Sequence, residues 1–256
     1  MTEYAVMPKA DYQNACNSIR AKTGAIEPLK SGDLSTAISS IQDIDAILNK
    51  TVTKSSSETA TAIQPYFFQN CANLTDIYFP KVVSIDGRAF FGCSALTAVS
   101  SVNFPLLREF TGDQVFFNCT SLTTVDFPLL EAITPFAFQN CGALVSVNLP
   151  LLTEIPVQAF RTCAKLNNLH FPNVTSIGDY AFYLCRRLDT LILSSETPCE
   201  FTGTAKTFEE TPIANGTGYI YVPAALIEDY KVMTNGVVYA NQFRAKEDYP
   251  EICGGV

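Results

Sequence analysis

Residues 71–90 read CANLTDIYFPKVVSIDGRAF, and variants of this stretch recur through the middle of the 256-residue chain. Its opening cysteine returns at Cys93, Cys119, Cys141, Cys163 and Cys185, at successive intervals of 22, 26, 22, 22 and 22 residues. A fixed period of this length is typical of a solenoid, in which each repeat forms one coil and stacked coils share a core. The sequence therefore predicts a stack of similar coils.

Apolar residues occupy fixed positions after each cysteine. In the first repeat, Leu74 is at the third position, and Ile77 and Phe79 are at the sixth and eighth. The alternation around Ile77 has the period of two expected of a strand, and Pro80 ends it because proline cannot donate a further ladder bond. Strands of neighbouring coils are expected to pair in parallel, about 4.8 Å apart. No coil buries its apolar side alone, so the ends of the stack need caps.

The second repeat is four residues longer than the others. Three of the extra residues fall between Leu96 and Pro105 and one falls within residues 111–116, and the apolar positions resume in phase after each insertion. Loops outside a stacked core absorb insertions, whereas core positions do not. With this alignment, Ser101 and Asn103 are expected at the outward strand positions of the second repeat.

The unit C-x-x-L-x-x-I-x-F-P-x-V-x-x-I-x-x-x-A-F, taken from Cys71 to Phe90, resembles the BspA-like class of leucine-rich repeats. The resemblance implies a leucine-rich-repeat solenoid of about six coils over residues 63–193. It implies short parallel strands, irregular or helical returns and a strand-lined face. It also implies a binding or adhesion role without catalysis.

Three further segments flank the repeats. Residues 1–50 contain two capped helical patterns and are expected to form a small helical N-terminal segment. Residues 51–62 are rich in Ser and Thr and are either a linker or an irregular first coil. Residues 194–256 are expected to form a mixed α/β C-terminal cap, with an alternating strand that ends at Pro223 and a helix from Ala224 to Val232.

Both flanks resemble phage-related sequences. The phrases ADYQ at residues 10–13, SIRAKTG at 18–24 and SGDL at 31–34 resemble the N-terminal segment of tail-associated proteins from phages and prophages of gut bacteria. Residues 211–223, together with YANQ at 239–242, resemble the closing module that follows such repeats in phage-linked proteins. These resemblances imply a tail-associated protein whose N-terminal helices attach it to other tail proteins.

Six of the nine cysteines mark the repeat, and each is expected to be a buried thiol that fills a small core position. In-register side chains point the same way, which fits poorly with the roughly 90° dihedral angle of a disulfide. The chain has no C-x-x-C pair, so no metal site is expected. The redox states of Cys16, Cys199 and Cys253, which lie outside the repeats, stay open. The structural ladder consists of Cys71, Cys93, Cys119, Cys141, Cys163 and Cys185.

Composition excludes several partners. The formal net charge is −8 and only 16% of residues are charged, whereas a generic nucleic-acid binder needs a basic face, so no nucleic-acid partner is expected. No apolar run approaches the roughly 20 residues of a membrane-spanning helix, so no membrane insertion is expected. The first six residues lack the basic-then-apolar pattern of a signal peptide. This start fits a virion component that is assembled in the bacterial cytoplasm.

Candidate catalytic residues are few. His170 is the sole histidine and has no repeat-aligned Ser or Cys partner, whereas a nucleophile needs a base and that base needs an orienting group. The adjacent carboxylates Glu209–Glu210 and Glu228–Asp229 are typical of solvated surface rather than of an acid/base pair held across a cleft. No catalytic residue and no cofactor are expected. A glycan hydrolase remains an alternative only if carboxylates from the caps converge on a pocket.

The fifth and seventh positions of each repeat are expected to form parallel rows of side chains on one extended face, where solenoids usually bind their partners. The candidate ligand-binding residues on this face are Asp76, Tyr78, Asn103, Thr124, Asp126, Asn148, Asn168 and His170. Such small polar groups suit a glycan or a protein loop. They are equally compatible with a merely soluble face, because few aromatic or Arg anchors accompany them.

Two functional hypotheses follow from these observations. The first is a non-enzymatic binding or structural protein of a phage or prophage tail, whose strand-lined face contacts a protein or glycan on a bacterial or host surface. The alternative is a bacterial adhesin of the BspA-like class, placed on the cell surface or secreted. An upstream signal sequence or a wall-anchoring partner gene would favour the adhesin.

Overall fold

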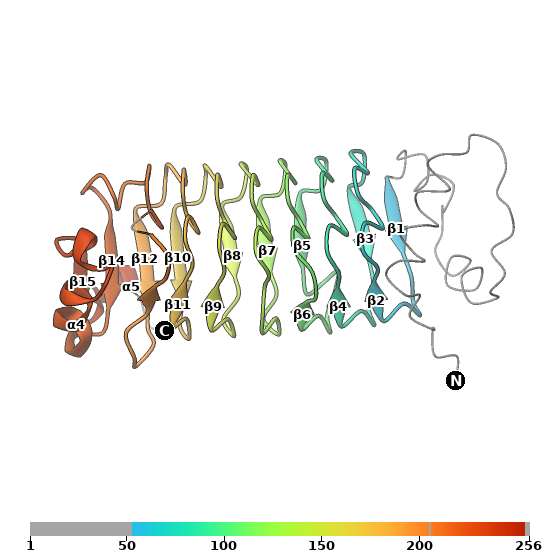
Figure 1. The fold of residues 1–256 in the computed structure, drawn as a ribbon. Coiled ribbons are helices and arrows are strands. Elements are labelled where there is room, and N and C mark those ends of the chain that lie inside the picture. The colour runs from blue at the N-terminus through green and yellow to red at the C-terminus, as the bar shows by residue number, and fades with distance from the viewer. Residues whose placement is uncertain (1–52, 205, 254–256) are drawn as a thin grey trace, which may run out of the picture.

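The structure, a computed structural model, describes residues 53–204 and 206–253. These residues form a stack of coils that lie side by side, with a small group of helices at the C-terminal end (Figure 1). The predicted solenoid of short parallel strands is confirmed. The helices predicted for residues 1–50 fall outside the described residues.

The coils contribute short strands to two rows, except that the coil of β7 contributes only an isolated bridge, at Ala132, to the second. The first row consists of β1 (Lys54–Ser56), β3 (Asp76–Tyr78), β5 (Ala98–Ser100), β7 (Thr124–Asp126), β8 (Ser146–Asn148), β10 (Asn168–Phe171), β12 (Thr190–Leu193), β14 (Tyr219–Val222) and β15 (Phe243–Ala245). The second row consists of β2 (Ala62–Ile63), β4 (Ser84–Ile85), β6 (Glu109–Phe110), β9 (Glu154–Ile155), β11 (Ser176–Ile177) and β13 (Glu200–Phe201). Every strand pairing among the described residues is parallel.

Parallel pairing places equivalent repeat positions side by side. β7 pairs with β8 so that Val125 lies opposite Val147, and Asp126 lies opposite Asn148. The sixth position therefore faces the core, whereas the fifth and seventh positions face outward, as the alternation predicts. Pairing is interrupted between β3 and β5 and between β8 and β10, which divides the first row into three sheets.

The stack begins before the repeat pattern becomes regular. β1 pairs with β3 and β2 pairs with β4, so the Ser/Thr-rich residues 54–63 form an irregular first coil rather than a linker. Ser55 takes the inward position that Ile77 fills in the next coil, and it is buried. The sequence does not indicate a strand here, because small polar residues stand where the other repeats have apolar residues.

The second repeat departs from the predicted alignment. β5 pairs with β7 so that Val99 lies opposite Val125. The three extra residues therefore follow the strand, and the placement of Ser101 and Asn103 at outward strand positions is wrong. Both Ala98-Val99-Ser100 and Ser101-Val102-Asn103 offer a central valine. Alternation alone cannot tell which triplet is the strand; pairing with Val125 decides it.

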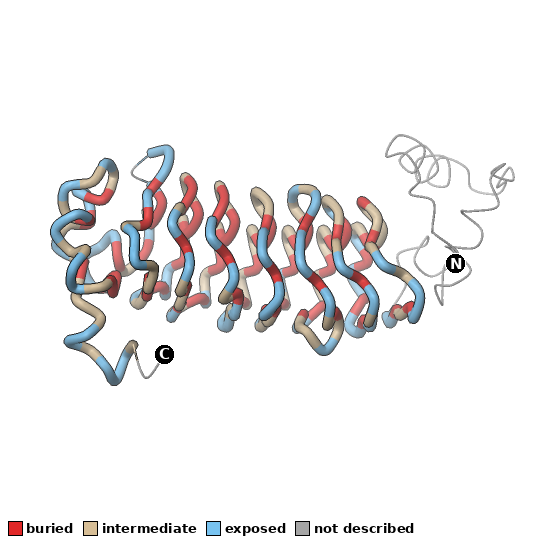
Figure 2. The backbone as a smooth tube through the Cα atoms, turned by 90° about the horizontal axis from the view of Figure 1, so that it is seen from below, coloured by how far each residue is buried: buried red, intermediate tan, exposed pale blue. Residues whose placement is uncertain are grey.

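A column of phenylalanine rings forms the centre of the core. Its members, all fully buried, are Phe68, Phe90, Phe116, Phe138, Phe160, Phe182 and Phe208. Neighbouring ring centroids are 5.0–5.7 Å apart, and neighbouring ring planes differ by 1–16°. Buried and exposed segments alternate along each coil around this core (Figure 2). The column explains why every repeat ends in Phe.

The returns to each cysteine are tight turns rather than helices. Two residues in each turn adopt a left-handed backbone, as Phe136 and Asn140 do, both with φ 62°. Asn adopts this left-handed region more readily than a bulky residue such as Phe does. Backbone hydrogen bonds between coils stabilise the turn; Phe138, for example, donates its N–H to the carbonyl oxygen of Ala159 at 2.8 Å.

The C-terminal cap continues the first row and then closes it. β14 pairs with β12, and β15 pairs with β14. The predicted helix from Ala224 to Val232 is present as a 3-10 turn followed by α4. The helical elements are η1 (Ala224–Leu226), α4 (Ile227–Val232), η2 (Val237–Tyr239), η3 (Lys246–Asp248) and α5 (Pro250–Cys253). Within residues 53–204 and 206–253, no helix has the length and apolar character needed to cross a bilayer.

Candidate functional site

The outward side of the first row forms an extended polar surface, called here the strand face. The structure places seven of the eight predicted binding residues on its strands: Asp76, Tyr78, Thr124, Asp126, Asn148, Asn168 and His170. Their backbones are held in parallel register, so the side chains form two rows across successive coils. Because the strands share a rigid core, the geometry of this surface is set before any partner arrives.

Polar contacts link neighbouring coils along the strand face. Asn148 donates its Nδ2–H to Oδ1 of Asp126 at 2.7 Å. Lys54 Nζ lies 3.3 Å from Oδ2 of Asp76, and both side chains are well exposed. Tyr78 is 44% exposed and is the one aromatic side chain on β3. The face therefore offers carboxylate, amide and phenol groups at fixed spacing.

Asn103 has a structural role beside this surface. Its Nδ2–H donates to the carbonyl oxygen of Ile77 at 2.9 Å, and its Oδ1 accepts the N–H of Ser100 at 2.9 Å. Its own carbonyl oxygen accepts the N–H of Phe79 at 2.8 Å. Asn103 thus bridges β3 and β5 at the point where strand pairing is interrupted.

The C-terminal segment closes one end of the strand face. Ile192 and Tyr221 occupy outward positions in register, yet they are 8% and 3% exposed. The Tyr221 ring contacts the ring of Tyr249, with centroids 5.2 Å apart, which places the segment after β15 over these positions. Ile192 is therefore covered, and the open part of the seventh-position row ends at His170.

His170 lies at this boundary and is half-buried. Its Nε2 lies 3.1 Å from Oγ of Ser194, and burial together with nearby Lys246 lowers its pKa. Within the part of the chain that the structure describes, no hydrogen bond to Nδ1 of His170 is present. A base that activates a serine needs such an orienting partner. Among the described residues, no such partner accompanies the His170–Ser194 pair.

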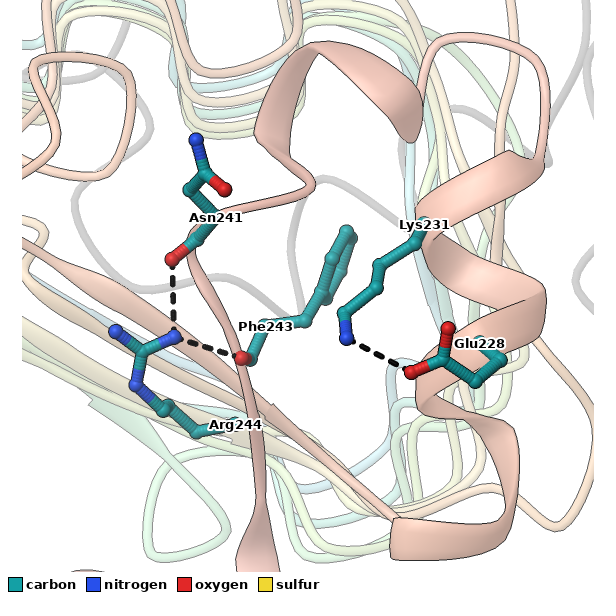
Figure 3. A network of polar contacts seen from close by, with 5 residues as sticks. All are labelled: Glu228, Lys231, Asn241, Phe243 and Arg244. Carbon is teal, nitrogen blue, oxygen red and sulfur yellow. Dashed lines mark hydrogen bonds and ion pairs between the residues drawn. The ribbon is translucent and has the colours of Figure 1, made fainter.

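Two residues of the cap extend the site beyond the predicted set. The guanidinium of Arg244 lies 4.2 Å from the centroid of the Tyr219 ring. Nη1 of Arg244 donates to the carbonyl oxygens of Asn241 and Phe243, at 2.9 and 2.8 Å, which fixes its orientation (Figure 3). Sequence reasoning missed this pair because the repeat period stops before residue 194, and only β-pairing places both residues at the end of the first row.

The predicted cysteine ladder is buried. All six repeat cysteines are thiols with no exposed surface. Burial raises the pKa of Cys141 and of Cys185 to about 12. Cys199 is also a buried thiol, whereas Cys253 is partly exposed. Cys16 lies outside the described residues.

The cap carboxylates belong to separate surface contacts. Glu209 lies 3.8 Å from Nζ of Lys206, and Glu228 lies 2.8 Å from Nζ of Lys231 (Figure 3). Among the described residues, no group of three or more His, Cys, Asp or Glu side chains is placed to hold a metal ion.

Comparisons with known proteins agree with this fold. The family model for the BspA type leucine-rich repeat region matches residues 61–189 in six copies. A leucine-rich repeat protein from Eubacterium ventriosum is 22% identical, with a TM-score of 0.52 over 64% of this chain and 44% of that one. One from Bacteroides ovatus is 25% identical, with a TM-score of 0.48 over 68% of this chain and 40% of that one. No curated protein matches the chain.

A leucine-rich cell surface protein from Faecalibacterium prausnitzii is also similar, at 18% identity, with a TM-score of 0.31 over 62% of each chain. The chain spans less than half the length of the Bacteroides and Eubacterium proteins. Leucine-rich-repeat proteins are generally non-enzymatic binding proteins. Because the family model covers half of the sequence, in the same coils that carry the cysteine ladder, the chain belongs to the family of BspA-type leucine-rich-repeat proteins.

Proposed function

We propose that this protein is a non-enzymatic binding protein that uses its strand face to contact a protein or glycan on a bacterial or host surface. One observation carries the proposal: the outward side chains of β7 and β8, including Asp126 and Asn148, stand in register outside the core. The strands of the first row carry exposed or partly exposed outward side chains from Lys54 to His170, so the face is accessible to a partner.

The chemistry of the strand face supports a hydroxyl- or amide-rich partner. The Asp126–Asn148 pair presents a carboxylate beside an amide, and Asn168 and Tyr78 add further polar groups at the ends of the open face. Each of these groups forms hydrogen bonds with a protein loop or with sugar hydroxyls. Because short paired strands hold them, little conformational entropy is lost on binding.

For the biological context, we propose a component of a phage or prophage tail that is assembled in the bacterial cytoplasm and carried in the virion. The resemblance of both flanking segments to tail-associated proteins supports this context. The N-terminal segment then attaches the protein to other tail proteins, and the strand face points to the host. Mass spectrometry of purified particles of the encoding element tests it: the protein is expected in the particles. Its presence in the cell envelope instead would favour the adhesin.

The strand face itself is tested by binding of the labelled full chain to intact bacterial cells. Asn148→Ala and Asp126→Ala are expected to weaken binding at least about fivefold, because a few central residues dominate an interface. Asn73→Ala is the matched control, since Asn73 is exposed but lies outside the strand rows. Equal binding by wild type, Asn148→Ala and Asp126→Ala would exclude the strand face as the contact surface.

A further inference from the structure

The tight turns present a second surface, which the strand-face proposal does not use. Two outward side chains per coil form it, and it is called here the turn face. Its first column consists of Tyr66, Arg88, Gln114, Phe136, Gln158, Tyr180 and Lys206, and its second column consists of Gln69, Phe91, Phe117, Gln139, Arg161, Tyr183 and Glu209. Aromatic and Arg side chains, scarce on the strand face, are concentrated on the turn face.

These side chains pack against one another across coils. The rings of Phe91 and Phe117 stack with centroids 4.8 Å apart and planes 3° apart. The guanidinium of Arg88 lies 5.8 Å from the centroids of both the Tyr66 and the Phe91 rings. All four residues in these contacts remain at least partly accessible. Aromatic and Arg groups in such a setting are typical anchors for a ligand.

The turn face contains a cavity of about 300 Å³ at the second repeat. Four successive coils line it, with Tyr66 at one end, Phe136 at the other, and Arg88 and Gln114 between them. The lining residues are Pro65, Tyr66, Asp86, Gly87, Arg88, Gly112, Asp113, Gln114 and Phe136. A cavity of this size lies at the lower limit for small-molecule sites and accommodates one sugar unit.

The single extra residue of the second repeat builds this cavity. Residues 111–114 carry one residue more than the equivalent turn of the first repeat, which places Gly112 and Asp113 at the rim. A Cβ on Gly112 would collide with the Asp86 carboxylate and with the backbone of Gly87, so only glycine allows this close approach.

Hydrogen bonds hold the enlarged turn from both sides. The carbonyl oxygen of Asp113 accepts the N–H of Arg88 at 2.9 Å. The carbonyl oxygen of Gly112 accepts the hydroxyl of Thr134 at 2.9 Å. Because neighbouring coils on each side stabilise it, the cavity is preformed, and a ligand that binds there spends little free energy on ordering the turn.

The polar groups in the cavity combine donors and acceptors. Arg88 donates its Nε–H to Oε1 of Gln114 at 2.6 Å, which directs the amide nitrogen of Gln114 toward other acceptors. The carboxylates of Asp86 and Asp113 supply acceptors. A sugar hydroxyl both donates and accepts, and the C–H face of a sugar ring packs on an aromatic ring. The Tyr66 and Phe136 rings supply such surfaces at the two ends.

We propose that this cavity is a binding site for one unit of a neutral saccharide. The charge of the cavity lining favours a neutral ligand. The lining carries two carboxylates and one guanidinium, and the excess negative charge repels phosphate or an acidic sugar. No metal cluster of three or more ligands occurs in the described part of the chain, which disfavours a cation site. The site lies on the turn face, so it does not depend on the strand-face proposal.

The test is titration of the full-length protein with a panel of neutral mono- and disaccharides, including glucose, galactose, mannose and N-acetylglucosamine, followed by amide NMR shifts of Gly87 and Gly112. Gln114→Ala and Asp113→Asn are expected to weaken binding about tenfold, the cost of about one charge-assisted hydrogen bond. Gln158→Ala is the matched control, because Gln158 occupies the same left-handed turn position two coils away. It is expected to bind as wild type does.

Three results would overturn the proposal. These are no shift at Gly87 or Gly112 with any neutral saccharide, equal weakening by Gln114→Ala and Gln158→Ala, and preferential binding of sialic acid or glucuronic acid. Thermal unfolding of each variant separates lost binding from lost folding, and Asp113→Asn, which keeps the size of the side chain, covers the case in which Gln114→Ala unfolds. The amide shifts of Gly87 and Gly112 report on the turn-face cavity alone, so binding there is measured separately from binding at the strand face.

Discussion

The thiol of Cys119 donates a hydrogen bond to the carbonyl oxygen of Phe90 in the preceding coil, with Sγ and O 3.2 Å apart. The same oxygen accepts the N–H of Cys93 at 3.2 Å. Equivalent bonds from thiol to carbonyl join the pairs Cys93 and Phe68, Cys141 and Phe116, Cys163 and Phe138, and Cys185 and Phe160. The cysteine of the repeat is therefore both a small core residue and a donor that links successive coils.

Replacing this donor is expected to destabilise the stack. Cys119→Ala removes the thiol from a fully buried position and is expected to lower the free energy of unfolding by about 1–3 kcal/mol. Urea unfolding followed by circular dichroism measures the change. Ser94→Ala is the control, because Ser94 donates to the carbonyl oxygen of Ala72 on the exposed surface, and its loss is expected to cost less than about 0.5 kcal/mol. Equal effects of the two substitutions would contradict a buried contribution from the thiol.

The ladder thiols are expected to resist modification in the folded protein. Thiol reagents attack the thiolate, and burial raises the pKa of Cys141 and Cys185 to about 12, so the thiolate is scarce near neutral pH. Among the eight described cysteines, Cys253 alone is partly exposed. Burial also raises the pKa of Cys253, but its thiol is partly exposed. In a Cys16→Ser background, mass spectrometry is therefore expected to find one cysteine, Cys253, alkylated faster than the others until urea exposes them. Rapid alkylation of any ladder cysteine would contradict this packing.

The phenylalanine column is expected to be the most sensitive part of the core. Phe138 stacks between Phe116 and Phe160, with centroids 5.6 and 5.4 Å away. Phe138→Ala is expected to cost about 3–5 kcal/mol, because a large cavity opens between rigid coils. Phe136→Ala, two residues away on the partly exposed turn, is expected to cost much less. The order of the two denaturation midpoints checks the prediction, and a reversed order would refute it.

Asn103 is expected to stabilise the junction between β3 and β5. Asn103→Ala removes hydrogen bonds to the backbone of Ile77 and Ser100 and is expected to cost about 1–2 kcal/mol. Val102→Ala is the control, since Val102 is 75% exposed in the same turn and its loss is expected to change stability by less than about 0.5 kcal/mol. Hydrogen exchange at Phe79, whose N–H bonds to Asn103, is expected to rise in Asn103→Ala only.

Acid is expected to weaken the C-terminal end of the strand face through His170. Burial and Lys246 lower the pKa of His170 in the folded protein below its ordinary value of 6.5. Between the lowered pKa and 6.5, His170 therefore binds more protons in the unfolded chain than in the folded one. The free energy of unfolding therefore falls as the pH drops through this window. Comparing unfolding at about pH 7.5 and about pH 5.5, wild type is expected to lose more stability than His170→Gln. Equal losses would show that His170 does not contribute.

The pattern of the sequence was sufficient for the coil and its period. The spacing from Cys71 to Cys185 and the inward positions such as Ile77 and Val125 predict parallel strands, because positions that face a shared core are filled mainly by apolar residues. The cysteine ladder was predicted for the same reason. The second row, which includes Ile155 and Ile177, was not predicted as strands, because two-residue strands show no alternation.

The position of the strand face was predicted in large part, and its limits were not. Seven of the eight candidate residues lie on the strand face because alternation decides which side a strand residue faces. Asn103 was misplaced because Val99 and Val102 are equivalent in pattern, and only pairing with Val125 distinguishes them. Tyr249 covers the outward position of Tyr221 through a contact between segments with no common period.

The sequence by itself determined the repeat, the inward and outward sides of its strands and the buried cysteines, because these depend on local alternation and on one period. Only the tertiary structure decided where the open face ends and where aromatic and Arg side chains gather. The cavity between Tyr66 and Phe136 depends on four coils and one extra residue, Gly112, in a turn. Such a site depends on how neighbouring coils pack, and the repeat pattern of a single coil does not contain that information.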